Sequence, residues 1–220
     1  SPPRPGPPVT PQDSEAAVDL HPARRTAITQ SDLLDAALRL IGPHRSVSSL
    51  SLREVAREAG IAPNSFYRQF RDIDELAVAL IDVAGQSLRR IVGAARHRAE
   101  AEHGVVRGSV EAFMEQVRAD DKLLHVLLRE GTVGSDAFKH AVDRELGFFE
   151  DELHHDLVRF AKLRNQPLSE PAVAAKAITR LAFAMGATAL DLPPDRDAEL
   201  VDQLTTMVRM ILVGARAMPK

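Results

Sequence analysis

The sequence of 220 residues contains no cysteine. A chain without cysteine has no disulfide framework, no thiolate metal ligands and no cysteine nucleophile, and this composition fits a reducing compartment. No apolar run approaches the ~18 to 20 residues of a membrane-spanning helix. The N-terminal region also lacks the basic and apolar segments of a signal peptide. We therefore expect a cytoplasmic protein that has no membrane partner.

Signatures of catalysis are missing as well, because the sequence has no Gly-rich phosphate loop, nucleophile elbow or pair of catalytic acids. Two Glu-x-x-His pairs, Glu100 with His103 and Glu152 with His155, are of the kind that ferritin-like di-iron enzymes carry on helices. The first pair falls at a helix end before Gly104, and the second falls in a strongly polar stretch suited to water. We expect neither an enzyme nor a bound metal or cofactor, and keep a metal-dependent oxidase as a remote alternative.

The segment from Ser51 to Phe70 predicts two short helices joined by a sharp turn. Ser51 is a good N-cap, and Glu54 can bond back to its amide to complete a capping box. Gly60 can take the left-handed conformation that ends the first helix, and Pro63 suits the first position of the second. This arrangement is a helix-turn-helix whose second helix has roughly two turns. The outward face of that helix is polar and cationic.

Charge is distributed unevenly along the chain, although the formal net charge is only −3. Residues 24–71 hold eight arginines against four acids, whereas residues 72–220 hold 19 basic and 24 acidic residues. A compact basic module therefore accompanies an acidic body. Such an asymmetry suits a protein that presents one end to nucleic acid phosphates.

The remaining pattern predicts an all-α protein with three parts. Residues 1–23 hold seven of the fourteen prolines and are expected to form a disordered tail. Residues 24–71 form the DNA-binding domain, in which a helix at 31–41 covers the helix-turn-helix. Residues 72–220 form a larger helical domain, because their apolar residues recur with a period near 3.6. Its helices are expected at 72–101, 105–119, 121–130, 135–164, 170–190 and 197–217.

The run LREVAREAGIAPNSFYRQFRDIDEL at 52–76, ahead of an all-helical body, resembles the TetR family of transcriptional repressors. Together with Phe113-Met114, LLRE at 127–130, AFKHAVDREL at 137–146 and MVRMI at 207–211, it is similar to the repressors of unsaturated fatty acid synthesis and acyl desaturation. The likeness covers about residues 24–213. Gln69 departs from the pattern, since the family usually has histidine there. The resemblance implies a repressor that binds double-stranded palindromic operator DNA.

The outward face of the predicted motif supplies candidate DNA contacts. Arginine on a recognition helix can fork onto guanine or bind a phosphate, and residues at the N-terminal end of such a helix usually meet bases. Arg53 and Arg57 also have a plainer interpretation as solvated charges that offset Glu54 and Glu58. The residues that we expect to contact DNA are Ser51, Arg53, Pro63, Asn64, Ser65, Tyr67 and Arg68.

Six of the eight phenylalanines lie in the body, near flexible methionines. Such a cluster suits either an ordinary core or an elongated apolar tunnel. The resemblance favours a tunnel for a long-chain acyl thioester, carried by coenzyme A or acyl carrier protein, with another apolar small molecule as the alternative effector. The candidate ligand-binding residues are Phe113, Met114, Val117, Leu124, Leu127, Phe148, Phe149 and Phe183.

The two last predicted helices, at 170–190 and 197–217, are unusually rich in small and apolar residues. They could complete the core of a monomer or pair with their copies in a four-helix interface. We expect a homodimer held by these helices, with Leu204 and Ile211 in the contact.

Overall fold

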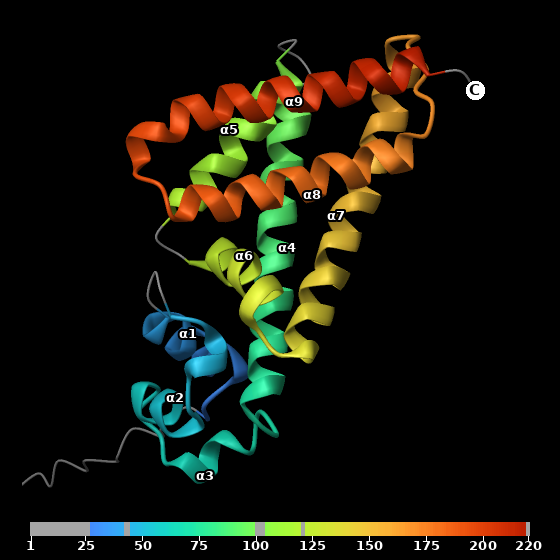
Figure 1. The fold of residues 1–220 in the computed structure, drawn as a ribbon. Helices are drawn as coiled ribbons and strands as arrows, with labels where there is room; N and C mark the ends of the chain where they lie inside the picture. The colour runs from blue at the N-terminus through green and yellow to red at the C-terminus, as the bar shows by residue number, and fades with distance from the viewer. Residues whose placement is uncertain (1–26, 42–44, 100–103, 120–121, 219–220) are drawn as a thin grey trace, which may run out of the picture.

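The computed structural model describes residues 27–41, 45–99, 104–119 and 122–218. All regular structure in these ranges is helical, so the predicted all-α class is confirmed. A small N-terminal group of helices lies at one end of a larger helical body, as Figure 1 shows. The predicted proline-rich tail and the predicted helix end at Gly42 and Pro43 lie outside the described residues.

The head, which comprises residues 27–70, is built from α1 (Gln30–Leu40), the 3₁₀ turn η1 (Val47–Ser49), α2 (Leu52–Glu58) and α3 (Pro63–Phe66). Thr29 caps α1, because its hydroxyl accepts from the amide of Asp32 while the Asp32 carboxylate accepts from the amide of Thr29. α1 packs on α2, and α2 packs on α3. Leu33, Val55 and Phe66 are fully buried between them. The three predicted helices therefore share one small core.

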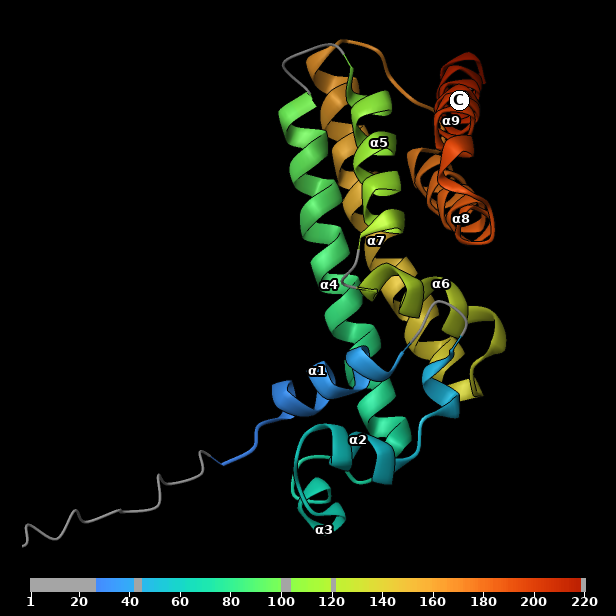
Figure 2. The same ribbon diagram turned by 90° about the vertical axis from the view of Figure 1, so that its left-hand side faces the viewer.

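The head continues into the body through α4 (Ile73–Ala99), a helix of 27 residues. Asp72 begins it by accepting from the amide of Glu75 at 2.8 Å, whereas Glu75 accepts from the amide of Arg71. At about 1.5 Å per residue, α4 is roughly 40 Å long. It runs from the head to the far end of the body in both views (Figures 1 and 2). One rigid element thus reaches both the helix-turn-helix and the body interior.

The body completes the fold with α5 (Val105–Arg118), α6 (Leu123–Val133), α7 (Asp136–Leu163), α8 (Pro171–Leu190), the turn η3 (Pro194–Arg196) and α9 (Asp197–Ala217). α4, α5 and α7 run side by side, and α8 and α9 cross them as a second layer (Figure 2). α6 lies against α4, α7 and α8, between the head and that second layer. The predicted boundaries of these helices differ from the observed ones by at most three residues.

The expectation that Leu204 lies in the dimer contact is wrong, because this residue is on the inner face of α9. Leu204 is 1% exposed and belongs to the body core, whereas Ile211 is half-buried. The strongly exposed apolar residues of α9 are instead Met210 at 67% and Val213 at 59%. Leu204 therefore stabilises the monomer, and the face that remains open carries the methionine and valine.

α8 corrects the expectation that no apolar stretch reaches the length of a membrane span. Residues Pro171–Leu190 are long and apolar enough by length and composition, with a mean hydropathy of 1.3 and 28% of the best window buried. Alanine-rich sequence raises hydropathy without large side chains, and one face of α8 packs on α7 and α9. One such helix is weak evidence for a span, and its open face also suits contact with another protein surface.

Candidate functional site

The helix-turn-helix has the predicted turn but a shorter second helix. Ser51 and Glu54 form the capping box, and Gly60 has a φ of 70°, which is the left-handed region that glycine adopts readily. Pro63 is the first residue of α3. α3 is regular for only four residues, because the amides of Arg68 and Gln69 bond three residues back, to the carbonyls of Ser65 and Phe66. The predicted two turns are therefore one helical turn followed by a tighter one.

The outer surface of α3 and its following turn is open to solvent. Pro63, Asn64, Tyr67 and Arg68 are exposed and Ser65 is half-buried. Tyr67 is 61% exposed, and its ring rests edge-on against buried Phe66 at a centroid distance of 6.2 Å. α3 also lies at the end of the molecule opposite α9 (Figure 1). The surface can therefore approach a partner without obstruction from the body.

Arg53 and Arg57 do not offset the acids beside them in sequence. Glu54 is bound at 2.9 Å by Arg45, and Glu58 is bound at 2.7 Å by Arg39. Within the described residues, the side chains of Arg53, Arg57 and Arg68 are exposed and have no hydrogen-bond or ion-pair partner. The head thus holds uncommitted positive charge on its outer side.

The capping pair also sets the ionisation of Glu54. Hydrogen bonds from the Arg45 guanidinium, and then from the amide and hydroxyl of Ser51, lower the pKa of Glu54 from 4.5 to about 2. The Ser51 hydroxyl donates to Glu54 and accepts from its amide, so it is engaged within the head. Gln69 is engaged too, since its side-chain amide donates to the carbonyl of Ile28 at 2.8 Å. Gln69 therefore fastens the turn after α3 to the start of α1.

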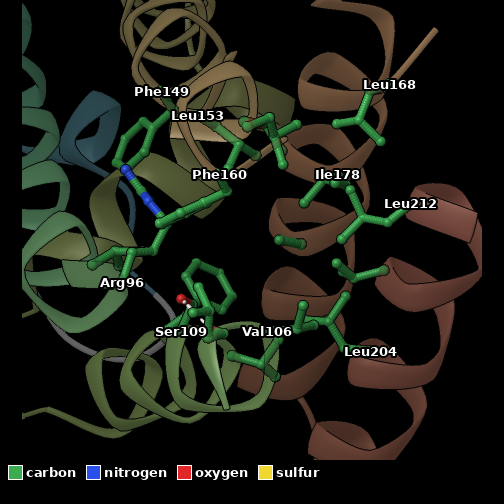
Figure 3. Close-up of a pocket in the computed structure, with 18 of the residues that line it drawn as sticks. Arg96, Val106, Ser109, Phe149, Leu153, Phe160, Leu168, Ile178, Leu204 and Leu212 are labelled. Carbon is green, nitrogen blue, oxygen red and sulfur yellow. Dashed lines mark hydrogen bonds between the residues drawn. The ribbon is translucent and has the colours of Figure 1, made fainter. Parts of the chain in front are cut away.

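The body contains an apolar cavity enclosed by α4, α5, α7, α8 and α9 (Figure 3). Its volume is about 160 Å³. One buried water needs only ~10 to 15 Å³ by a comparable measure, so this space is larger than a packing defect. Most of the lining is aliphatic or aromatic, and the labelled side chains in Figure 3 converge on it from several helices. The polar lining residues are Arg96, Ser109, Arg164, Gln166, Thr179 and Arg216.

Three of the eight predicted ligand-binding residues line this cavity: Phe113, Phe149 and Phe183. Phe183 is the centre of the group, with ring centroids 5.7 Å from Phe113 and 5.2 Å from Phe149. Four others are buried in the core but do not line the cavity; they are Met114, Val117, Leu124 and Leu127. Phe148 points elsewhere, since it is 44% exposed and lies under the Arg89 guanidinium at 4.9 Å.

The polar lining residues were not predicted from the sequence. Arg96 is 7% exposed, and its Nε donates to Asp156 at 2.7 Å, which neutralises a charge in the cavity wall. Arg164 and Arg216 are helix-end arginines 52 residues apart, and no local pattern places them together. Arg96 follows Val92 by four residues on α4, which places it on the apolar face of that helix. This spacing was the one feature of the sequence that indicated an inward position for Arg96.

Charged contacts join α4 to α7 beside the cavity. Arg89 binds the buried carboxylate of Glu145, and Arg144 of α7 binds Asp82 of α4. Burial raises the pKa of Glu145 above its ordinary value, although the bond from Arg89 opposes the shift. Gly85 leaves the space that Glu145 occupies, since a Cβ there would lie 2.0 Å from the carboxylate. α4 is therefore fixed in register against α7.

A second set of contacts joins the body to the head through α6. Glu130 of α6 is 1% exposed and accepts from the amide of Val47 at 2.8 Å and from the hydroxyl of Ser46 at 2.7 Å. Lys122, just before α6, donates to the carbonyl of Ile41 at 2.7 Å. We call these three contacts the joint. They attach α6 and the residue before it to Ile41 and to Ser46 and Val47, which lie in the segment between α1 and α2.

The cavity lining comes close to α6 at Gly186 of α8. A Cβ on Gly186 of α8 would lie 2.8 Å from the ring of Phe113 and 3.4 Å from Leu128 of α6. Phe113 lines the cavity, so a displacement of its ring is felt directly by α8 and α6. Phe113 of the cavity lining, Gly186 of α8 and Leu128 of α6 are therefore close neighbours, and Leu128 is two residues before Glu130 of the joint.

The side chains that the structure describes give no support to the alternative of a metal-dependent oxidase. In those ranges no group of three or more histidine or acidic residues is placed to hold a metal ion. Glu152 is ion-paired to Arg89 at 3.2 Å, and His155 is bonded to the carbonyl of Asp151 at 2.7 Å. Glu100 and His103 lie outside the described residues.

Two protein-family models match the chain. The model described as bacterial regulatory proteins, tetR family, matches residues 33–80 and thus contains the helix-turn-helix. The model described as tetracyclin repressor-like, C-terminal domain, matches residues 102–211, which is half of the chain. The first match covers most of the head and the first two turns of α4, and the second lies within the body.

Solved structures share the fold at low identity. FadR of Thermus thermophilus, a TetR family repressor in complex with lauroyl-CoA, is 17% identical with a TM-score of 0.62, over 87% of this chain and 96% of that chain. AibR in complex with isovaleryl coenzyme A and operator DNA is 17% identical with a TM-score of 0.61, over 81% and 97%. The SmeT–triclosan complex is 17% identical with a TM-score of 0.65, over 84% and 90%. At these identities the likeness concerns the fold alone.

Proposed function

The chain belongs to the TetR family of bacterial regulatory proteins, which bind DNA to regulate transcription, and from this premise we propose that it represses genes of fatty acid metabolism. The proposed effector is a long-chain acyl thioester that occupies the body cavity and changes operator affinity. The observation that carries the proposal is the cavity itself, which is apolar, reaches between five helices and lies beside α4. The finer resemblance to repressors of unsaturated fatty acid synthesis and acyl desaturation supports the same effector class. Repression of this kind takes place in the cytoplasm.

The head is proposed to place α3 and the turn after it in the major groove of operator DNA. Pro63, Asn64 and Ser65 lie at the N-terminal end of α3, which is the end that usually meets base edges. Arg68 and Arg53 supply charge for guanine or phosphate, and the exposed Tyr67 hydroxyl suits a phosphate oxygen. Ser51 remains a candidate through its backbone, because its hydroxyl is engaged with Glu54.

The protein is proposed to act as a homodimer joined through α8 and α9, which places two heads on one palindromic operator. The open faces of these helices carry Val173, Met207, Met210 and Val213, which are 39 to 67% exposed. An apolar surface of this kind is costly to leave in water and suits a copy of itself across a two-fold axis. The two heads would then meet successive major grooves, about 34 to 36 Å apart or a multiple of that distance.

The effector is proposed to act by changing how the heads are held. A ligand shifts the equilibrium between two arrangements only as far as it binds them differently. An acyl chain in the cavity would contact Val92 on α4 and Phe113 on α5, which lead to the head through α4 and through the joint. Saturated and unsaturated chains need differently shaped space, so they can favour different arrangements.

A second candidate effector is another apolar small molecule. The observation that favours it is the similar fold of SmeT in complex with triclosan, together with a cavity whose inner lining is mostly hydrocarbon. Triclosan itself therefore serves as the comparison ligand in the test.

The proposed function is tested by calorimetric titration of the protein with palmitoyl-, oleoyl- and octanoyl-coenzyme A and with triclosan. The two long-chain thioesters are expected to bind at least tenfold more tightly than octanoyl-coenzyme A, because each buried methylene contributes about 0.8 kcal/mol. Ala182→Leu should weaken the binding of the long-chain thioesters, since Ala182 lines the cavity and three added carbons would fill part of it.

Ala172→Leu is the matched control, because Ala172 is exposed in the first turn of α8 and does not line the cavity. It should bind the thioesters like the parent protein. Tighter binding of triclosan than of any thioester would favour the second candidate. Absence of binding by all three thioesters would contradict the proposal.

A further inference from the structure

The exposed residues in the lining mark where the cavity meets solvent, and we call this place the mouth. Of its lining residues, the exposed ones are Arg164, Gln166 and Arg216. Arg164 and Gln166 follow the end of α7, and Arg216 lies in the last turn of α9. The ends of α7 and α9 are together at the far end of the body from α3 in both views (Figures 1 and 2). A ligand therefore enters from the end opposite the head.

The mouth is held together by hydrogen bonds between the two helix ends. Ser169 donates its amide to the carbonyl of Ala215 at 2.7 Å and its hydroxyl to the carbonyl of Met218 at 2.8 Å. These bonds fasten the segment after α7 to the end of α9. Arg164 and Arg216 are thereby kept at the same opening although they are far apart in sequence.

Both arginines have charge to offer. Within the described residues the side chains of Arg164 and Arg216 have no hydrogen-bond or ion-pair partner. An arginine in the last turn of a helix is favourable for the helix dipole alone, so either position by itself indicates no ligand. Two arginines at the opening of an apolar cavity do indicate a ligand. The Arg164 guanidinium also lies 6.0 Å from the ring of Phe160, which lines that cavity.

The cavity therefore has a cationic mouth and an aromatic inner end formed by Phe113, Phe149 and Phe183. Its buried arginine, Arg96, is already paired with Asp156, so the interior suits an uncharged chain. We propose that Arg164 and Arg216, with Gln166, bind the phosphate groups of the effector's carrier while the acyl chain lies inside with its tail toward Phe183. Guanidinium groups bind phosphate through paired, charge-assisted hydrogen bonds.

This inference rests on the proposed acyl effector and adds its orientation and the part of the carrier that is recognised. Because the mouth is remote from α3, the carrier would lie away from the DNA, and the effector would act through helix packing alone. The shared chemistry is a phosphate linked to an acyl chain, which coenzyme A, a phosphopantetheine arm and a phospholipid all provide.

The test measures calorimetric affinity for palmitoyl-coenzyme A, palmitoyl-pantetheine, which has the same thioester without phosphates, and a phosphatidic acid with two palmitoyl chains. Arg164→Gln and Arg216→Gln should each reduce the affinity for palmitoyl-coenzyme A by about threefold to fivefold, as is typical of exposed charge pairs. The double variant should reduce it by more than tenfold. Palmitoyl-pantetheine should bind all variants equally within twofold. The salt dependence of palmitoyl-coenzyme A binding should also decrease in the double variant.

Arg90→Gln is the control, since Arg90 is exposed on α4, has no ion-pair partner among the described residues and does not line the cavity. It should leave all affinities unchanged, and Arg164→Lys should retain part of the binding. Tighter binding of the phosphatidic acid than of palmitoyl-coenzyme A would overturn the carrier assignment. If palmitoyl-coenzyme A and palmitoyl-pantetheine bind alike and the double variant behaves as the parent, the mouth inference is wrong while the proposed effector stands. If neither thioester binds, both proposals fail.

Discussion

At the scale of single residues, the head divides its arginines between two tasks. Arg39 and Arg45 are ion-paired to Glu58 and Glu54, whereas the side chain of Arg68 on the outer side has no ion-pair or hydrogen-bond partner among the described residues. Arg68→Ala should therefore reduce operator affinity by about 1 to 3 kcal/mol, as loss of a base or phosphate contact does. Arg39→Ala is the matched control and should leave DNA binding nearly unchanged. A gel-shift titration in which both variants bind like the parent would contradict the placement of this surface on DNA.

Neighbouring Asn64 and Tyr67 separate base recognition from phosphate binding. Asn64→Ala should relax the preference at one operator position, because this residue lies at the N-terminal end of α3. Tyr67→Phe should weaken binding to all sequences alike, since phosphates carry no sequence information. Binding to a panel of operators with single base changes measures both effects. A change in base preference for Tyr67→Phe alone would reverse the two assignments.

The ionisation of Glu54 gives a pH dependence to the stability of the head. Its pKa is about 2 in the folded chain against an ordinary 4.5, so folding favours the ionised form. This contribution is complete above about pH 4.5 and is lost as the pH falls from 4.5 toward 2. Glu54→Gln should be less stable than the parent at pH 6, and the difference should shrink as the pH falls below 4.5.

Urea denaturation at pH 6, 4.5 and 3.5 measures this difference. Glu115→Gln is the control, because Glu115 is exposed on α5 and has no ion-pair partner within the described ranges. A difference between parent and Glu54→Gln that stays constant with pH would contradict the origin assigned to it.

At the scale of helices, replacing glycine by alanine should have opposite effects on stability at two positions. A Cβ at Gly186 would lie 2.8 Å from the Phe113 ring, whereas a Cβ at Gly147 in α7 would meet nothing within 4 Å. Gly186→Ala should destabilise the protein by about 1 to 3 kcal/mol through overpacking. Gly147→Ala should stabilise it by about 0.5 to 1 kcal/mol, since alanine is the better helix former. Equal effects in urea unfolding would show that α5 and α8 do not approach closely at Phe113.

A substitution in α6 should separate thioester binding from the effect of the thioester on operator affinity. Glu130→Ala leaves the buried amide of Val47 without its acceptor, which should cost about 1 to 3 kcal/mol of stability. It should preserve thioester binding, because Glu130 does not line the cavity, and should reduce the effect of the thioester on operator affinity. Calorimetry and gel shift on the same preparation measure the two quantities. Full retention of the thioester effect would leave α4 as the sole connection.

Sequence patterns predicted the helices well because their ends are chemically marked. Thr29, Ser51, Gly60 and Pro63 each perform the local task that their residue type suggests. The short length of α3 and the turn η1 carried no such mark. Periodicity identifies which residues face inward, but it does not tell which inward residues border empty space. For that reason Leu124 and Phe113 were indistinguishable in sequence, although only Phe113 lines the cavity.

At the scale of the whole molecule, the dimer proposal depends on the open faces of α8 and α9. Met210→Glu places a charge on a residue that is 67% exposed, so the monomer fold should be preserved while the apolar contact is broken. Light scattering should give the mass of a monomer, and binding to a palindromic operator should be lost. Leu204→Glu is unsuitable for this purpose, since that residue is buried and the fold would fail. A Met210→Glu variant that remains dimeric would place the interface elsewhere.

In the proposed mechanism, a thioester bound in the body changes how tightly the heads bind DNA. The most direct measurement is the operator dissociation constant of the parent protein, by fluorescence anisotropy, without effector and with saturating palmitoyl- or oleoyl-coenzyme A. We predict a change of at least fivefold for one of the two, because allosteric coupling typically amounts to about 1 to 3 kcal/mol. Octanoyl-coenzyme A at the same concentration should have little effect. A dissociation constant that stays within twofold under both long-chain thioesters, at concentrations where calorimetry shows them bound, would contradict the claim.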